Sequence, residues 1–117
     1  MHTANLGKKG EERAAEALIS GGMSIICRNF RSKFGEIDII ALDGETLVFA
    51  EVKAWSKFGI ENLSYSVNSK KQARIIETAK YFLSIHRQYY ERAIRFDVVF
   101  VSQEAVTHLA SAFMERV

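Results

Sequence analysis

Residues 35–53, GEIDIIALDGETLVFAEVK, decide the fold. Two apolar runs rich in β-branched residues, 37–42 and 46–52, lie on either side of Asp43-Gly44. Asp-Gly between two such runs is among the strongest short-range signs of a β-hairpin. We therefore expect two antiparallel strands, with charged residues gathered at the end away from the turn: Glu36, Asp38, Glu51 and Lys53.

The turn decides how closely Asp38 and Glu51 approach. If residues 44–45 form the loop, Asp38 faces Glu51 directly; if residues 43–44 form it, Glu51 lies one diagonal away. Both loops leave Asp38, Glu51 and Lys53 on one face, because side chains alternate with period two. Directly opposed Cβ atoms lie roughly 4.5 to 5.5 Å apart and diagonal ones about 7 to 8 Å. A three-residue loop with a bulge would break this parity, and the sequence leaves that alternative open.

Asp38 and Glu51 would place two carboxylates side by side in an otherwise apolar sheet. They repel each other unless a cation or a proton lies between them. Hard oxygen ligands suit Mg²⁺ or Mn²⁺, which is commonly held by one or two carboxylates and several waters. Lys53 points to the same side and can polarise a water or a phosphate oxygen. This combination is typical of metal-assisted hydrolysis of a phosphodiester.

The hairpin resembles the PD-(D/E)XK nuclease superfamily, whose signature is a carboxylate followed by a hairpin and D/E-x-K. Asp38 and Glu51-Val52-Lys53 match it. The wider sequence is similar to the YraN-like bacterial family, which is related in pattern to archaeal Holliday junction resolvases. The matching segments span nearly the whole chain: GKKGE (7–11), RNFR (28–31), GEID (35–38), LVFAEVK (47–53), KQ (71–72) and RFDV (95–98). YraN-like sequences commonly carry Arg at the position of Trp55, so the resemblance does not support a phosphate contact at this position, while the acidic residues still match.

The resemblance implies an α/β fold with a restriction-endonuclease-like core, a mixed central β-sheet flanked by helices. A chain of 117 residues predicts one packed domain, so we expect a single nuclease-like domain over residues 1–117. The resemblance also implies that Asp38, Glu51 and the Val52 carbonyl hold the metal, and that Lys53 positions or activates the attacking water. Glu36 would line the same site as a secondary acid unless a bulge turns it away.

Glu11 lies in a segment, residues 7–20, that has helical periodicity and stops before the turn signal Gly21-Gly22. It falls near the middle of the apolar stripe formed by Ala14, Ala15 and Leu18. There an unpaired buried charge would be costly. Glu11 either reaches the metal end of the sheet as a third acidic group or simply favours the helix N-terminus. Resolvase-like members of the superfamily carry a helical Glu at the active site, so the resemblance favours the first alternative.

A second helix is predicted from the S-x-x-Q capping box of residues 69–72, with Ser69 as N-cap and Gln72 reaching back. It should run to about residue 89. A helix N-terminus attracts anions, so we expect nucleic-acid contacts from its first turns and from the basic connection 31–34: Lys70, Lys71, Arg74, Arg31 and Lys33. For Arg31 the alternative is pairing with a nearby Glu. Gln72 either caps the helix or supports the site, as a polar residue often does in the superfamily.

The remaining segments predict strands over residues 23–30 and 95–102, a loop over 54–67, a short edge strand over 106–110, and a helical turn through Phe113 and Met114. Within the loop, Trp55 either stacks on a base or anchors the loop to the core. Asp97 is expected to pair with Arg95 or with neighbouring backbone. The histidines show no zinc spacing, so each is expected at the surface or in packing: His2, His86 and His108.

The composition is that of a globular protein, with 48% hydrophobic and 26% charged residues. A net charge of +2 does not by itself demand a nucleic-acid partner. Cys27 is the single cysteine, which favours a reducing compartment. No charged-then-apolar leader and no apolar run near the ~20 residues of a membrane helix occurs. We therefore expect a cytoplasmic protein without a membrane partner.

Together these features predict a Mg²⁺- or Mn²⁺-dependent endonuclease that acts on DNA phosphodiesters, with branched or junction DNA as the substrate that the resemblance favours. One alternative is a nucleic-acid-binding protein that keeps the nuclease fold without cleaving. Another is a partner-binding module in which the acidic cluster is a relic. Intact Asp38, Glu51 and Lys53 favour an enzyme, because a decayed site tolerates losses. Two cuts in a four-way junction require two active sites, which a homodimer would supply.

Overall fold

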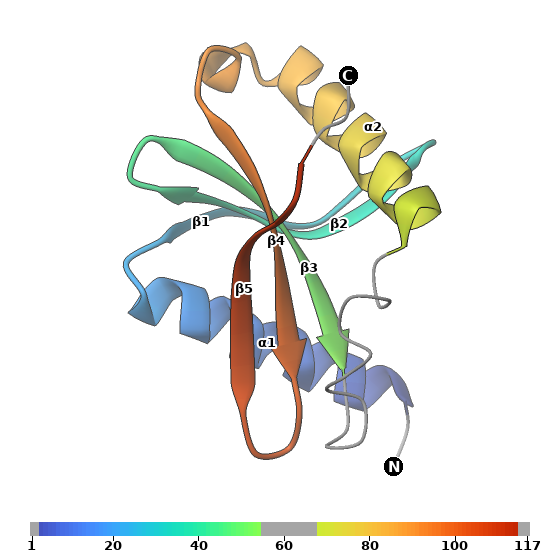
Figure 1. Ribbon diagram of the computed structural model, residues 1–117, viewed down its shortest axis with the longest axis vertical. Coiled ribbons are helices and arrows are strands. Elements are labelled where there is room, and N and C mark those ends of the chain that lie inside the picture. Colours follow the sequence, from blue (N-terminus) through green and yellow to red (C-terminus); the bar gives the residue numbers. More distant parts are fainter. Residues whose placement is uncertain (1–2, 55–67, 115–117) are drawn as a thin grey trace.

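The computed structural model describes the backbone of residues 3–54 and 68–114, and the side chains of 9–54 and 68–114. Two helices flank a twisted sheet of five strands (Figure 1). The elements follow in the order α1 (Thr3–Ser20), β1 (Ser24–Ser32), β2 (Gly35–Asp43), β3 (Thr46–Ala54), α2 (Ser69–Ile85), the 3-10 helix η2 (Arg87–Tyr89), β4 (Ile94–Val101) and β5 (Val106–Phe113). Neither helix is long and apolar enough to cross a membrane, as judged over these described residues.

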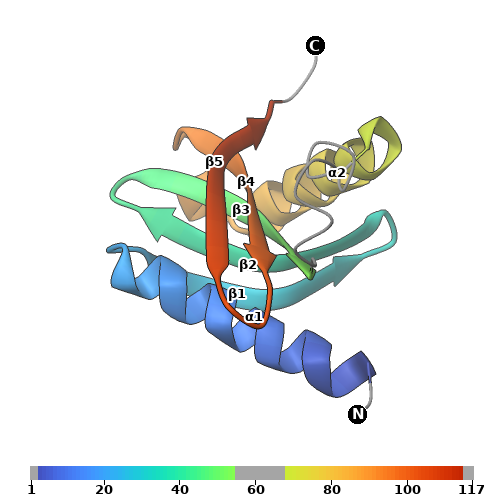
Figure 2. The same ribbon diagram turned by 60° about the horizontal axis from the view of Figure 1, so that its bottom comes forward.

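The strands lie in the sheet in sequence order, β1-β2-β3-β4-β5. Only β3 and β4 run parallel, and the other neighbours are antiparallel. A parallel pair needs a long crossover, and here the connection through α2 supplies it. Seen from the two directions of Figures 1 and 2, α1 covers one face of the sheet and α2 the other. The predicted α/β fold with a mixed sheet flanked by helices is confirmed, and it is compatible with a restriction-endonuclease-like core.

The core is divided by the sheet into two clusters. The cluster beneath α2 is aromatic, built around Phe49, Phe82, Phe96 and Phe100. The cluster beneath α1 has smaller side chains, including Ala14, Leu18, Val48 and Val99. β4 contributes to both, as its nearly continuous apolar run predicts for a strand covered on two faces. This burial fixes the central strands, and with them the ends at which polar side chains emerge.

The β2–β3 hairpin has the register of the first alternative, with residues 44–45 as its loop, because Asp43 pairs with Thr46. Gly44 takes the positive φ of 61° that this tight turn requires. The alternation of β2 nevertheless breaks further along. Ile37 and Ile40 both enter the cluster beneath α2, although residues three apart in an unbroken strand face opposite sides. The break falls at Asp38, so the irregularity lies within the strand and not in the loop.

Helix α1 begins at Thr3, four residues before the predicted start at 7, and it ends at Ser20 as predicted. Its end is a Schellman motif: Met23 N–H donates to the Leu18 carbonyl and Gly22 N–H to that of Ile19. Gly22 takes the left-handed conformation that this motif needs, with φ of 99°. Leu18 and Met23 then enter the same core cluster. The glycine signal therefore gave the correct helix end.

Helix α2 has Asn68 as its N-cap, so the predicted Ser69–Gln72 capping box is wrong. The Asn68 side chain accepts a hydrogen bond from Lys71 N–H. Asn and Ser are about equally good N-caps, so propensity could not choose between these neighbours. The helix ends at Ile85, four residues before the predicted end, where His86 N–H donates to the Phe82 carbonyl.

The predicted helical turn at Phe113 and Met114 is also wrong, because β5 continues through Phe113. The Phe113 ring stacks on Phe96 with ring centroids 5.1 Å apart, so this end of β5 is held on the core. β1 extends to Ser32, which reduces the predicted basic connection to a turn at Lys33 and Phe34. Most of the predicted loop over 54–67, Trp55 included, lies outside the described residues.

Candidate active site

Asp38 and Glu51 meet where the β2–β3 ladder stops. The last ladder pair is Ile39 with Ala50. Beyond it, the Asp38 carboxylate accepts a hydrogen bond from Val52 N–H at 2.8 Å. A side chain thus takes the place of the backbone acceptor that a continuous strand would supply, which accounts for the break in β2. The Asp38 side chain is also hydrogen-bonded to that of Glu51. The predicted convergence of the two carboxylates is therefore observed.

Lys71, from the first turn of α2, contacts this acidic pair. Its Nζ lies 2.9 Å from Glu51 Oε2, and the Glu51 side chain is only 8% exposed. The ammonium of Lys53 is close by, because its side chain interacts with that of Lys71. A buried carboxylate is costly without a partner. In this structure Lys71 is the cation that compensates Glu51.

Burial and the neighbouring Glu51 shift the protonation of Asp38. Burial first, then the hydrogen bond and the charge of Glu51, raise the pKa of Asp38 to about 8. Burial alone would raise the pKa of Glu51 as well, but hydrogen bonds from Asp38 and Lys71 hold it below its ordinary value. The pair therefore shares a proton, with Asp38 neutral and Glu51 ionised near neutral pH.

The pKa values of Lys53 and Lys71 are also shifted in opposite directions. Burial and then the adjacent Lys71 lower the pKa of Lys53. Burial would lower the pKa of Lys71 too, but its hydrogen bonds to Lys53 and Glu51 raise it. Two acids and two bases with pKa values moved in opposite directions are typical of a site that transfers protons. Lys53 is the base that loses its proton more readily.

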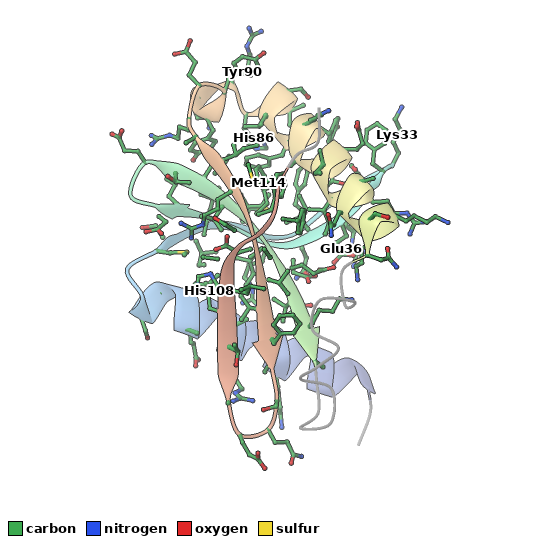
Figure 3. All side chains as sticks on the ribbon, viewed as in Figure 1. Lys33, Glu36, His86, Tyr90, His108 and Met114 are labelled. Atoms are coloured by element: carbon green, nitrogen blue, oxygen red, sulfur yellow. The ribbon has the colours of Figure 1, made fainter. Side chains whose placement is uncertain are left out.

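An open cavity of about 270 Å³ exposes this group to solvent, and it is lined by Gly35, Glu36, Asp38, Glu51, Lys71, Arg74 and Ile75. Glu36 thus lines the cavity of Asp38 and Glu51, as one alternative predicted, despite the break in β2. Its carboxylate pairs with Arg31 at 3.3 Å. Gly35 lies against α2, where an added Cβ would be in ordinary contact with Arg74 Cβ at 3.5 Å. Figure 3 shows Glu36 beside the start of α2.

The donor set fits Mg²⁺ or Mn²⁺. Two carboxylates within hydrogen-bonding distance lie beside an open cavity, and a lysine ammonium already occupies a cation position at Glu51. Mg²⁺ is commonly bound by one or two carboxylates and keeps several waters. Within residues 9–54 and 68–114, no group of three or more His, Cys, Asp or Glu is arranged to hold a metal. A metal here would therefore depend on Asp38, Glu51, water and a main-chain oxygen such as the Val52 carbonyl.

Comparison with known sequences identifies the family. The model of the uncharacterised protein family UPF0102 matches residues 10–101, which include the whole acidic site. The chain belongs to this family. A UPF0102 protein of Treponema denticola is 45% identical over 93% of this chain and 95% of its own. A UPF0102 protein of Thermodesulfovibrio yellowstonii is 41% identical over 97% of this chain and 99% of its own length.

UPF0102 is the YraN-like family, and it lies in the PD-(D/E)XK nuclease-like superfamily. The resemblance seen in the sequence is therefore confirmed at the level of the family. The UPF0102 match spans the segments of this chain that carry the two carboxylates and the two lysines of the site.

Glu11, at the start of the UPF0102 match, lies apart from the carboxylate pair. It lines a different cavity of about 740 Å³ on the α1 side, together with Lys9, Glu12, Arg13, Arg28 and Asn29. Its charge nevertheless contributes to raising the pKa of Asp38. In Figures 1 and 2 the end of β3 lies between the first half of α1 and the start of α2. Glu11 is thus within electrostatic reach of Asp38, and its support of a metal or its water stays a prediction.

Of the predicted nucleic-acid contacts of this UPF0102 member, Arg74 and Lys71 line the acidic cavity. Lys70 is exposed on the same helix, and Lys71 is engaged by Glu51. Arg31 pairs with Glu36, as its alternative interpretation predicted, and its side chain stays 77% exposed. Lys33 is exposed above the Phe34 ring, at the same end of the molecule as Glu36 in Figure 3. We refer to Arg31, Lys33, Lys70 and Arg74 together as the basic rim.

Gln72 lines a separate cavity of about 170 Å³ with residues that include Ile76, Lys80 and Met114. Its N–H donates to the Asn68 carbonyl, which is the first hydrogen bond of α2. The support of the acidic site by Gln72 stays a prediction.

Sequence reasoning found only part of a second polar network in this UPF0102 member, which centres on Asp97. Asp97 is fully buried and accepts hydrogen bonds from Arg95 Nε and Nη2, both at 2.9 Å, and from Ser111 N–H. The Arg95 pairing confirms the prediction for Asp97. His108 on β5, labelled in Figure 3, adds a contact from Nε2 at 2.7 Å that its lone position in the sequence did not indicate. This network ties β5 to β4, away from the acidic cavity.

Proposed function

We propose that this protein is a metal-dependent endonuclease that hydrolyses phosphodiesters of DNA. The observation that carries the proposal is the meeting of Asp38 and Glu51 at an open cavity, with Lys53 and Lys71 beside them. A purely structural hairpin has no need of a buried and a partly buried carboxylate in contact, since directly opposed like charges destabilise a sheet. Membership of a nuclease-like superfamily supports the same reading.

The residues would divide the chemistry as follows. Asp38 and Glu51, with the Val52 carbonyl, hold a Mg²⁺ or Mn²⁺ ion, which when bound polarises a phosphate oxygen and acidifies water. As a ligand Asp38 would be ionised, and its proton would pass to solvent through the open cavity. Lys53, whose pKa burial lowers, orients the attacking water and compensates charge on the phosphate. Glu11 supports the centre electrostatically from α1.

The basic rim would bind the DNA backbone. Arg74 lines the acidic cavity, Arg31 pairs with Glu36 of its lining, and Lys70 and Lys33 are exposed. Cations at such positions neutralise phosphates and make binding dependent on salt. Such contacts read backbone and shape, so they fit branched or junction DNA as well as a linear duplex. Symmetric cutting of a four-way junction needs two such sites, and we include a homodimer in the proposal for that reason.

The second candidate is a nucleic-acid-binding protein that keeps the fold without cleaving. One observation favours it: the Lys71 ammonium lies on Glu51, at the position that a catalytic cation would need. In that case the basic rim still binds DNA, and the internal ion pair replaces the metal permanently.

A cleavage assay separates the two candidates. The protein is incubated with a four-way junction, single-stranded DNA and duplex DNA, each with Mg²⁺, Mn²⁺ or EDTA. The nuclease predicts cleavage that needs the metal and is lost in Glu51→Gln. Glu45→Gln is the matched control, because it makes the same change at an exposed position in the hairpin turn. Metal-independent binding without cleavage of any substrate would refute the nuclease in favour of the binding protein.

A further inference from the structure

We propose that Lys71 is a displaceable internal cation: it neutralises Glu51 in the metal-free protein and leaves when a divalent cation binds, and its freed ammonium then takes a phosphate of the nucleic acid. This inference rests on the proposed function and adds to it a coupling between two ligands. Metal binding and nucleic-acid binding would strengthen each other through one side chain.

The helix cap fixes where the Lys71 side chain starts. Asn68 Oδ1 accepts the Lys71 N–H at 2.9 Å, which holds the first turn of α2 in place. From that anchored backbone a flexible four-carbon stem carries a compact charge, a combination that lets lysine change partners at little cost. The neighbouring Lys70 starts from the same turn but is exposed.

The ammonium lies at the boundary between the buried acids and solvent. Lys71 Nζ is 2.9 Å from Glu51 Oε2, and the side chains of Lys71 and Glu51 are 37% and 8% exposed. Lys71 also lines the open cavity beside Asp38 and Arg74. An ion entering through that cavity reaches Glu51 from the side that Lys71 occupies.

A divalent ion and the ammonium cannot both stay at Glu51 without strong repulsion. Mg²⁺ binds carboxylate oxygen at about 2.0 to 2.1 Å, and two cations held on one carboxylate in a half-buried site repel at short range. Lys71 also lies against Lys53, and its charge lowers the pKa of Lys53. When the ion supplies the charge that compensates Glu51, the ammonium of Lys71 is no longer needed there.

Once released, the ammonium can bind a phosphate of the nucleic acid. The start of α2 also carries Lys70 and Arg74 and has the positive end of the helix dipole. These positive groups together favour binding of a backbone phosphate. Because coupling between two ligands is reciprocal, a cation that frees Lys71 raises the affinity for nucleic acid, and nucleic acid raises the affinity for the cation.

The first test measures Mn²⁺ binding to the full chain by calorimetry, without nucleic acid. Lys71→Met keeps the length of the side chain and removes the competing charge, so we expect Mn²⁺ to bind at least about tenfold tighter, the scale of a hydrogen bond to a charged group. Lys70→Met removes the same charge from an exposed neighbour, and we expect a change below about threefold because solvent screens it. Lys71→Arg keeps a cation on Glu51 and should stay close to the unaltered chain.

The second test measures the coupling. Binding of a fluorescent four-way junction is followed by anisotropy with and without Ca²⁺, a hard cation that also takes oxygen ligands. In the unaltered chain and in Lys70→Met, Ca²⁺ should raise the affinity for DNA. In Lys71→Met that gain should shrink several-fold, because no ammonium is released. Circular dichroism confirms that each variant is folded.

The outcomes separate the two proposals. Equal Mn²⁺ affinities for Lys71→Met and Lys70→Met, with measurable binding in both, would overturn the role of Lys71 and leave the metal site intact. No Mn²⁺ binding by any of these proteins would overturn the metal-dependent nuclease, and the role of Lys71 with it. Tighter Mn²⁺ binding by Lys71→Met alone, together with a reduced gain from Ca²⁺, supports the inference.

Discussion

Replacing Asp38 by Asn should make the metal-free protein more stable at alkaline pH. The pKa of Asp38 is raised from 3.8 to about 8 by burial and by Glu51. The folded state therefore holds the proton more tightly than the unfolded state does. This contribution to stability is fully present below pH 3.8, is lost as the pH rises, and has vanished once the pH passes about 8. An amide cannot ionise, so Asp38→Asn does not suffer this loss.

The magnitude follows from the shift. At 1.36 kcal/mol per pKa unit, a shift of about four units gives an upper value of about 6 kcal/mol. Glu51 offsets part of this free energy, because its pKa is lowered in the folded state. The contribution of Glu51 to stability is therefore present at alkaline pH and lost in acid. After this discount we expect the stability of Asp38→Asn relative to the unaltered chain to rise by about 2 kcal/mol between pH 5 and 8.5.

Urea unfolding followed by circular dichroism, in EDTA at pH 5, 7 and 8.5, measures this difference. Glu45→Gln serves as control, because Glu45 is exposed in the hairpin turn and its substitution should have no comparable effect on the pH dependence. A stability difference between Asp38→Asn and the unaltered chain that stays constant with pH would refute the reasoning. So would a variant that is less stable than the unaltered chain at pH 8.5.

Two further predictions concern the scaffold. Asp97→Asn should lower the free energy of unfolding by about 3 kcal/mol, because it breaks a buried charge network that includes Arg95 and His108. Urea unfolding measures this loss. A loss below about 1 kcal/mol would show that the network contributes little to stability. Asn68→Ala should lower the free energy of unfolding by about 1 kcal/mol, because α2 loses its N-cap. In the same assay Ser69→Ala, at an exposed position, should have almost no effect. Equal losses for the two variants would contradict the assignment of Asn68 as the N-cap.

The hairpin and the position of the acidic pair could be predicted because they depend on local chemistry. Asp43-Gly44 marked the turn, and the register that follows from that turn places positions 38 and 51 side by side at the end of the ladder. The break in β2 at Asp38 could not be predicted, because it arises when the carboxylate takes the Val52 N–H from a neighbouring strand. Nothing in the sequence of β2 alone encodes that contact.

Long-range pairing sets the limit of the prediction. Lys71 was expected to face phosphate, but it lies on Glu51, and that outcome depends on how α2 is placed over the sheet. Glu11 was expected near the metal, and the periodicity that put it on the inner side of α1 could not show that it lines another cavity. The predicted helical turn at Phe113 failed because stacking on Phe96 keeps the chain extended.

The central claim is that Asp38 and Glu51 bind a divalent metal, and calorimetric titration of the metal-free protein with Mn²⁺ tests it most directly. We predict saturable binding that Glu51→Gln weakens by more than about tenfold, since loss of even an outer partner of a ligand costs about 10- to 100-fold, whereas Glu45→Gln leaves it unchanged. Equal affinity in Glu51→Gln and Glu45→Gln, or no binding to the unaltered chain, would contradict the claim.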